Sequence, residues 1–299
     1  MSNENKTSNV VLFGADGQLG KELQGTTPDQ TNLSSFTRER IDITDQQAVE
    51  ETIESIKPDW VINVAAYTAV DKAEEERDEA FAVNYTGAEN IARAAKLANA
   101  RLVHLSTDFV FDGNRSSPYQ PSDKTSPLGV YGASKQAGDE AVIQTLPDDS
   151  VIIRTAWLYS KHGHNFVKSM LRLMAEREEL GVVTDQIGTP TSARVLARVI
   201  WQVIQQNLFG IYHWTDAGVA SWYDFAVAIQ EEAIAAGVLN SHPVCTIKPI
   251  RTSDYPTPAE RPSYSVLDKT ATWQALNTSP VHWRTALKEV LGELRDDKN

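Results

Sequence analysis

The chain has 299 residues, of which 41% are hydrophobic and 23% are charged, and its formal net charge is −12 at pH 7. This acidity argues against sequence-independent nucleic-acid binding, which relies on basic surface, although local donors can still bind an anionic small ligand. The single cysteine, Cys245, excludes an internal disulfide framework, and no apolar run approaches the roughly 20 residues that cross a bilayer. The start of the chain, MSNENKTSN, is polar and lacks the apolar centre of a leader peptide, so we expect a cytoplasmic protein without a membrane partner.

Short apolar strands alternate with helical patterns in the first half of the chain. The strand candidates show little alternation, which is typical of strands buried on both faces of a sheet. They are residues 9–13, 60–66, 101–106 and 150–154. The helical patterns between them cover residues 17–25, 45–57, 78–99 and 129–146. Strands separated by helices predict βαβ units and an α/β fold, with a doubly wound parallel sheet of the Rossmann type.

The pattern of predicted elements changes after about residue 155. Amphipathic helices are expected at residues 165–178 and 221–237, and loops that contain proline and glycine join them. We expect residues 1–155 to form the Rossmann-type domain. Residues 156–299 should form mainly a smaller mixed α/β region that covers it, with some segments returning to the main sheet.

A glycine-rich stretch, FGADGQLG, follows the first predicted strand and opens a helix. Its glycines let the backbone approach a pyrophosphate closely, and the helix N-terminus offers unpaired N–H groups. The usual dinucleotide fingerprint is G-x-G-x-x-G, and here one glycine is displaced. We interpret the stretch as a dinucleotide-binding loop, and a tight turn without a ligand is the alternative. The cofactor-binding residues expected here are Gly14, Gly17, Gln18, Leu19 and Gly20.

Residues at the end of the second predicted strand bear on the choice between NADH and NADPH. An NAD-selective site usually places an acidic side chain there for the ribose hydroxyls. Here the sequence reads Thr37-Arg38-Glu39-Arg40. Arginine can pair with a 2′-phosphate through bidentate hydrogen bonds, which favours NADPH, with Arg38 as the better candidate. Because Glu39 is acidic, NADH stays an alternative cofactor. The alternative for the two arginines is that they are solvated at the strand end and bind no cofactor.

Hydroxyl groups and a Tyr–Lys pair suggest a catalytic centre. Ser106 and Thr107 end the fourth predicted strand, at the edge of the sheet where ligands bind, and could hydrogen-bond a substrate oxygen. Tyr131 and Lys135, in YGASK, are one helical turn apart and share a helix face. The ammonium is expected to lower the tyrosine pKa and ease proton exchange, and the lysine can also hold the nicotinamide ribose. We therefore predict that Thr107, Tyr131 and Lys135 are catalytic.

Together these motifs resemble the extended short-chain dehydrogenase/reductase family, and within it the branch that reduces dTDP-4-dehydrorhamnose. The likeness covers nearly the whole chain, and its more specific segments lie outside the cofactor half. They are RTAWLY (154–159), NFVKSML (165–171), DQIGTPT (185–191) and YPTPAERPSYS (255–265). The resemblance implies NADPH- or NADH-dependent reduction of the C4 ketone of dTDP-4-dehydro-β-L-rhamnose to dTDP-β-L-rhamnose, the last step of dTDP-L-rhamnose synthesis.

The resemblance also implies roles for individual residues. Tyr131 would protonate the C4 carbonyl oxygen, Lys135 would assist, and Thr107 would hydrogen-bond that oxygen. The substrate contacts would be Thr107, Asp108, Trp157 and Arg261. The further cofactor contacts would be Asp42, Ile43, Ala65, Ala66 and Tyr67.

Several alternatives stay open beside these roles. Trp157 could belong to the core, Arg261 could brace a loop, and Asn84 could support either a proton relay or helix packing. Tyr67 stands where some relatives have histidine, which makes that contact less secure. Some relatives bind Mg²⁺ through glutamates at a dimer contact, but the acidic run at residues 71–79 is typical of a solvated helix face. We therefore assign no metal site and leave Mg²⁺ and a homodimer open.

Rival functions use the same scaffold. Phe109 follows Thr107-Asp108 where related dehydratases carry glutamate, so elimination is not expected. An epimerase, or a reductase of another nucleotide 4-keto-6-deoxy sugar, would use the same tyrosine and lysine. A non-catalytic regulatory subunit on this fold would not need them.

Overall fold

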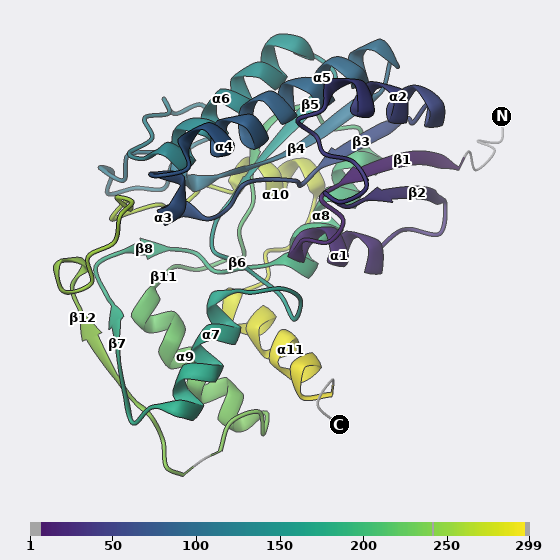
Figure 1. Cartoon of the computed structure of the whole chain (residues 1–299). Helices are drawn as coiled ribbons and strands as arrows, with labels where there is room; N and C mark the ends of the chain where they lie inside the picture. Colours follow the sequence, from purple (N-terminus) through teal and green to yellow (C-terminus); the bar gives the residue numbers. More distant parts are fainter. Residues whose placement is uncertain (1–6, 241, 297–299) are drawn as a thin grey trace.

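The computed structural model describes residues 7–240 and 242–296 (Figure 1). The absence of a leader peptide was predicted from the polar residues 1–9. Of these, residues 1–6 lie outside the described range. Within the described ranges, no helix is long and apolar enough to span a membrane.

A six-stranded parallel sheet forms the centre of the molecule, in the order β10-β5-β4-β3-β1-β2. Its strands are β1 Ser8–Phe13, β2 Thr31–Phe36, β3 Trp60–Asn63, β4 Arg101–Thr107, β5 Ser150–Thr155 and β10 Gly210–His213. The order reverses at β1, so the chain leaves the sheet in opposite directions after β1 and after β3. A crevice opens at such a switch point, beyond the carboxyl ends of the strands. The predicted fold class is confirmed.

Helices cover both faces of the sheet (Figure 1). One face packs against α2, α5 and α6, whose apolar residues join those of the strands in one buried cluster. The opposite face packs against α1, α8 and α10 in a second cluster. These helices are α1 Gln18–Gly25, α2 Gln46–Ile56, α5 Gly87–Leu97, α6 Val130–Thr145, α8 Ala193–Gln206 and α10 Thr270–Leu276.

A smaller region lies beside the carboxyl ends of the strands (Figure 1). Three helices, α7 Phe166–Glu176, α9 Trp222–Ala235 and α11 Trp283–Asp296, share an apolar cluster with the parallel pair β7 Glu179–Val183 and β12 Thr246–Ile250. Two short pairs connect this region with the main sheet. They are β6 Leu158–Tyr159 with β9 Thr191–Ser192, and β8 Ile187–Gly188 with β11 Ala220–Ser221.

Two predicted elements of the first half differ from the observed ones. The strand predicted at 60–66 ends at Asn63, because its side chain accepts a hydrogen bond from the Ala65 N–H, at 3.1 Å, and turns the chain. The helix predicted at 78–99 is α4 Arg77–Phe81, a π-helical turn at Ala82–Thr86, and α5. After residue 155, helix α8 packs on one face of the main sheet and strand β10 pairs with β5.

Candidate active site

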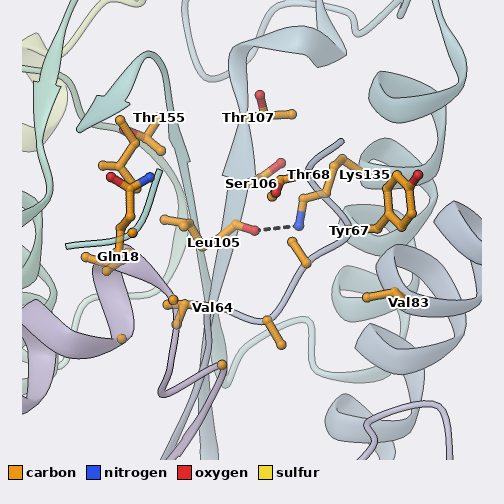
Figure 2. A pocket seen from close by; sticks show the side chains of 18 of the residues that line it. Gln18, Val64, Tyr67, Thr68, Val83, Leu105, Ser106, Thr107, Lys135 and Thr155 are labelled. Carbon is orange, nitrogen blue, oxygen red and sulfur yellow. Dashed lines mark hydrogen bonds between the residues drawn. The ribbon is translucent and has the colours of Figure 1, made fainter. Parts of the chain in front are cut away.

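A cavity of about 660 Å³ lies at the carboxyl ends of the central strands. Helix α1 and the loops after β1, β3, β4 and β5 line it, and Figure 2 shows side chains from these elements pointing into one space. All but one of the site residues predicted from the sequence line this cavity. They are Gly14, Gly17, Gln18, Leu19, Gly20, Arg38, Asp42, Ile43, Ala65, Ala66, Tyr67, Thr107, Asp108, Tyr131, Lys135 and Trp157.

The turn between β1 and α1 is packed too tightly for side chains. Gly14 has a φ of +87°, and a Cβ there would lie 2.6 Å from the Ala65 nitrogen. A Cβ on Gly20 would lie 2.2 Å from the Gly14 carbonyl oxygen. Helix α1 begins after Gly17 without a side-chain cap, so its first N–H groups are available to an anion at this end of the cavity. The turn fits the pyrophosphate of a dinucleotide.

Arg38 lies at the cavity wall just beyond β2. One of its Nη atoms is 3.2 Å from the Glu79 carboxylate, and 67% of the Arg38 side chain is exposed. The neighbouring Arg40 lies over the Phe36 ring, with its guanidinium carbon 5.5 Å from the ring centroid, and does not line the cavity. Of the two arginines at this strand end, Arg38 is thus the one that faces the ligand space.

Lys135 lines the cavity and is buried in its wall. Its Nζ donates a hydrogen bond to the Leu105 carbonyl oxygen at 2.8 Å, which Figure 2 marks with a dashed line. Burial lowers the pKa of Lys135 to about 8, and the Asp139 charge acts in the opposite direction. The lysine is therefore held in a fixed position by the strand that carries Thr107 at its end.

Tyr131 does not have the lowered pKa that the sequence predicts. Burial raises the pKa of Tyr131 to about 12, the charges of Asp108 and Asp139 raise it further, and a hydrogen bond with Thr107 acts in the opposite direction. The expectation that the Lys135 ammonium lowers this pKa was wrong, because desolvation of the phenolate dominates and two carboxylates act in the same direction. Tyr131 is thus protonated at neutral pH, which suits a group that gives a proton to a carbonyl oxygen.

The residues at the end of β4 form a short polar chain. The Thr107 hydroxyl donates to the Asp108 carboxylate at 3.0 Å and accepts from the Phe109 N–H at 3.2 Å. Burial raises the pKa of Asp108 to about 6, while hydrogen bonds from Ser265 and Thr107 oppose the rise. The Phe109 ring meets the edge of the Tyr131 ring at a centroid distance of 5.5 Å. These contacts fix the hydroxyl of Thr107 beside that of Tyr131.

Ser106 has a partner other than the one expected. Its side chain lines the cavity, yet its hydroxyl donates to Asp139 at 2.8 Å. The hydroxyl hydrogen therefore points away from the ligand space, toward helix α6. Both strand-end hydroxyls thus donate to a carboxylate in this structure, Ser106 to Asp139 and Thr107 to Asp108.

Trp157 lies at the boundary between the two regions of the molecule. It has a φ of +47°, which is rare for a bulky residue and is held here by packing. Its ring stacks on Trp222 at a centroid distance of 3.5 Å, and a Cβ on Gly188 would lie 2.6 Å from the ring. Trp157 thus both packs against the smaller region and lines the cavity.

Arg261 is the predicted residue that the structure does not bring to the cavity lining. Its guanidinium makes a bidentate pair with Asp71, with N–O distances of 2.9 and 2.8 Å, and a further bond to the Ala259 carbonyl oxygen. These contacts brace its loop against the short helix α3 (Val70–Ala73). A contact with the diphosphate of a substrate stays a prediction.

Asn84 lies in the π-helical turn and connects two walls of the site. Its Oδ1 accepts from the Tyr67 N–H at 2.9 Å, and its Nδ2 donates to the Tyr67 carbonyl and to the Ser134 hydroxyl at 3.1 and 3.0 Å. These hydrogen bonds hold the loop after β3 against α6, the helix that carries Tyr131.

Sequence reasoning missed cavity residues from the loop between β6 and α7. Gly163, His164 and Asn165 line the cavity, and the Asn165 amide donates to the Gln18 side-chain oxygen at 2.9 Å. These partners are 147 positions apart in the chain, so no local pattern signals the contact. The loop brings the smaller region directly onto the glycine-rich turn.

No metal centre is visible in the part of the chain that the structure describes. Within that part, no group of three or more His, Cys, Asp or Glu side chains is arranged to hold a metal ion.

The chain is similar to proteins of one family over nearly its whole length. The family model for the RmlD substrate binding domain matches residues 8–296. The dTDP-4-dehydrorhamnose reductase of Aggregatibacter actinomycetemcomitans is 43% identical, over 94% of this chain and 97% of the relative. A dTDP-4-keto-6-deoxy-D-glucose reductase of Streptomyces niveus is 38% identical, over 98% of this chain and 100% of the relative. The dTDP-4-dehydrorhamnose reductase of Bacillus anthracis, solved in complex with NADP, superposes with a TM-score of 0.89 at 38% identity, over 96% of this chain and 99% of that one.

Proposed function

The chain belongs to the family of dTDP-4-dehydrorhamnose reductases, and on this premise we propose that it reduces the C4 ketone of dTDP-4-dehydro-β-L-rhamnose to dTDP-β-L-rhamnose. One observation supports this most strongly. A single cavity brings the glycine-rich turn of a dinucleotide site together with Tyr131, Lys135 and Thr107. A nicotinamide cofactor fits the turn because the first N–H groups of α1 have no side-chain cap at this end of the cavity. The family and the cavity also argue against a non-catalytic subunit.

Each residue of the site has its own role in the proposed reaction. Tyr131, with its raised pKa, holds the proton that the ketone oxygen takes up as it becomes an alcohol. The Thr107 hydroxyl would turn from Asp108 to donate a hydrogen bond to the same oxygen, and Lys135 would place a positive charge near the reacting groups. When bound, the reduced nicotinamide supplies the hydride. Trp157 contacts the sugar, and the dTDP portion supplies binding energy that holds the ketone in reacting geometry.

The reaction is tested by the absorbance of reduced nicotinamide. The protein is mixed with freshly prepared dTDP-4-dehydro-L-rhamnose and with NADPH or NADH in separate cuvettes. We expect steady loss of absorbance that depends on the substrate. A parallel cuvette holds dTDP-4-keto-6-deoxy-D-glucose, because a relative from Streptomyces niveus is named for that substrate. Turnover of the second sugar alone would reassign the substrate, and turnover of neither, by protein that binds dinucleotide, would contradict the proposal.

We further propose that NADPH is the preferred cofactor, through Arg38. Replacing Arg38 by alanine is expected to raise the KM for NADPH about tenfold and to leave the KM for NADH within about twofold, since a charge-assisted bond to an exposed phosphate is lost. The control is Arg40→Ala, which removes the same charge two positions away from a side chain outside the cavity lining. Steady-state kinetics of both variants with both cofactors measure the effect. An equal change of both KM values in Arg38→Ala would rule out a phosphate-specific contact.

A further inference from the structure

Behind the catalytic pair lies a carboxylate to which the reaction above assigns no role. Tyr131, Lys135 and Asp139 follow one another at four-residue intervals on α6, so they share one face of the helix. Asp139 is 2% exposed. Its Oδ2 accepts from the Ser106 hydroxyl at 2.8 Å and lies 3.4 Å from the Arg154 Nε. Asp139 is thus fixed by two neighbouring strands, β4 and β5.

The second oxygen of Asp139 is buried without a hydrogen-bond partner. It lies 3.7 Å from the Nε2 of His104, which is also buried and unpartnered. Burial, helped by the charge of Lys135, holds the pKa of His104 well below its usual range, so the imidazole is neutral. The Nδ1 of His104 lies 3.2 Å from the Asn63 amide. The imidazole therefore brings no charge to Asp139.

Two buried cations flank the carboxylate. Arg154 contacts it directly, and Lys135 lies one helical turn away. Burial raises the pKa of Asp139, but the charges of Arg154 and Lys135 oppose the rise. In turn, the Asp139 charge is what opposes the loss of the Lys135 proton caused by burial. The charge of Asp108 raises the pKa of Tyr131. The carboxylate that acts on the pKa of Lys135 is that of Asp139.

We propose that Asp139 is a positioning residue of the reductase, which acts through Lys135 by keeping its ammonium charged although the lysine is buried. The proposal rests on the proposed function. A lone ammonium in this position would lose its proton more easily, because burial disfavours the charged form. Asp139 supplies the compensating charge without entering the ligand cavity, since it does not line that cavity.

The proposal predicts how activity depends on pH. Lys135 carries its charge below its pKa of about 8 and loses it above. In Asp139→Asn the carboxylate charge is absent, so the pKa of Lys135 falls. The alkaline limb of the kcat profile should then move to lower pH, by about one unit or more. Asp139→Glu keeps the charge and should restore a limb near that of the wild type.

The experiment measures kcat at saturating substrate and cofactor from about pH 6 to about pH 10. The matched control is Glu140→Gln, the next residue on α6, whose carboxylate is exposed and meets only the Gln136 amide at 2.8 Å. It removes the same charge and should leave the profile unchanged. Dinucleotide binding and a thermal melt confirm that each variant is folded.

A second variant keeps the proposal testable if Asp139→Asn does not fold. Ser106→Ala removes the hydroxyl that stabilises the Asp139 carboxylate and leaves its charge. The pKa of Asp139 should rise, so the carboxylate takes up a proton at higher pH and the acid limb of kcat moves upward. A lowered melting temperature with both limbs unmoved would show a structural role only, and would overturn the proposal. Absence of turnover in the wild type would instead refute the proposed function.

Discussion

Replacement of Tyr131 by phenylalanine is expected to lower kcat about a thousandfold while the Kd for the cofactor stays within about twofold. The phenol is the proton donor, and its pKa of about 12 means that it carries its proton at neutral pH. Phenylalanine keeps the ring that packs edge-on against Phe109, so the variant should fold and bind normally. Single-turnover absorbance measures the rate, and fluorescence titration measures the affinity for the cofactor.

The matched control is Tyr85→Phe. Tyr85 lies in the π-helical turn, is 37% exposed and does not line the cavity, so its hydroxyl can be removed without a change in kcat. If Tyr131→Phe turned over at a near-normal rate, the tyrosine could not be the proton donor. Asp108, whose pKa of about 6 is also raised by burial, would then be the next candidate.

A single methyl group on Gly20 is expected to weaken cofactor binding about a hundredfold or more. The added Cβ would lie 2.2 Å from the Gly14 carbonyl oxygen and 2.8 Å from the Ala15 Cα, and these backbone atoms can move only if the turn opens. Opening at a cost of about 3 kcal/mol corresponds to a hundredfold loss. Isothermal titration of Gly20→Ala with NADPH measures the loss.

Gly25→Ala is the control for this variant because it adds the same methyl group to the same helix. A Cβ on Gly25 meets nothing within 4 Å, so binding should be unchanged and the helix slightly stabilised. Equal affinities of the two variants would mean that the glycine-rich turn does not hold the dinucleotide. A thermal melt separates a local change in the turn from general unfolding.

The sequence predicted the parts of this protein that depend on local patterns. The glycine spacing at residues 13–20 and the four-residue spacing of Tyr131 and Lys135 are local, and the structure places both motifs around one cavity. Strands and helices of the first half could be located for the same reason. Family resemblance added Trp157, which no periodicity would identify.

Other features could not be predicted because they arise from contacts between distant segments. The hydrogen bond from Asn165 to Gln18 and the packing of Asp139 against Arg154 exist only once the chain is folded. The direction of the Tyr131 pKa shift is a similar case. It depends mainly on burial and on the Asp108 and Asp139 carboxylates that fold around the phenol, and the sequence shows neither.

The position of β10 has a consequence for how the protein can be made. The strand that completes the sheet beside β5, and the helix α8 that covers one of its faces, come from residues 193–213. While the chain emerges from the ribosome, the first 155 residues therefore have an open strand edge and an uncovered apolar face. Such an edge pairs readily with other chains. The central sheet is thus complete only after residue 213 has left the ribosome.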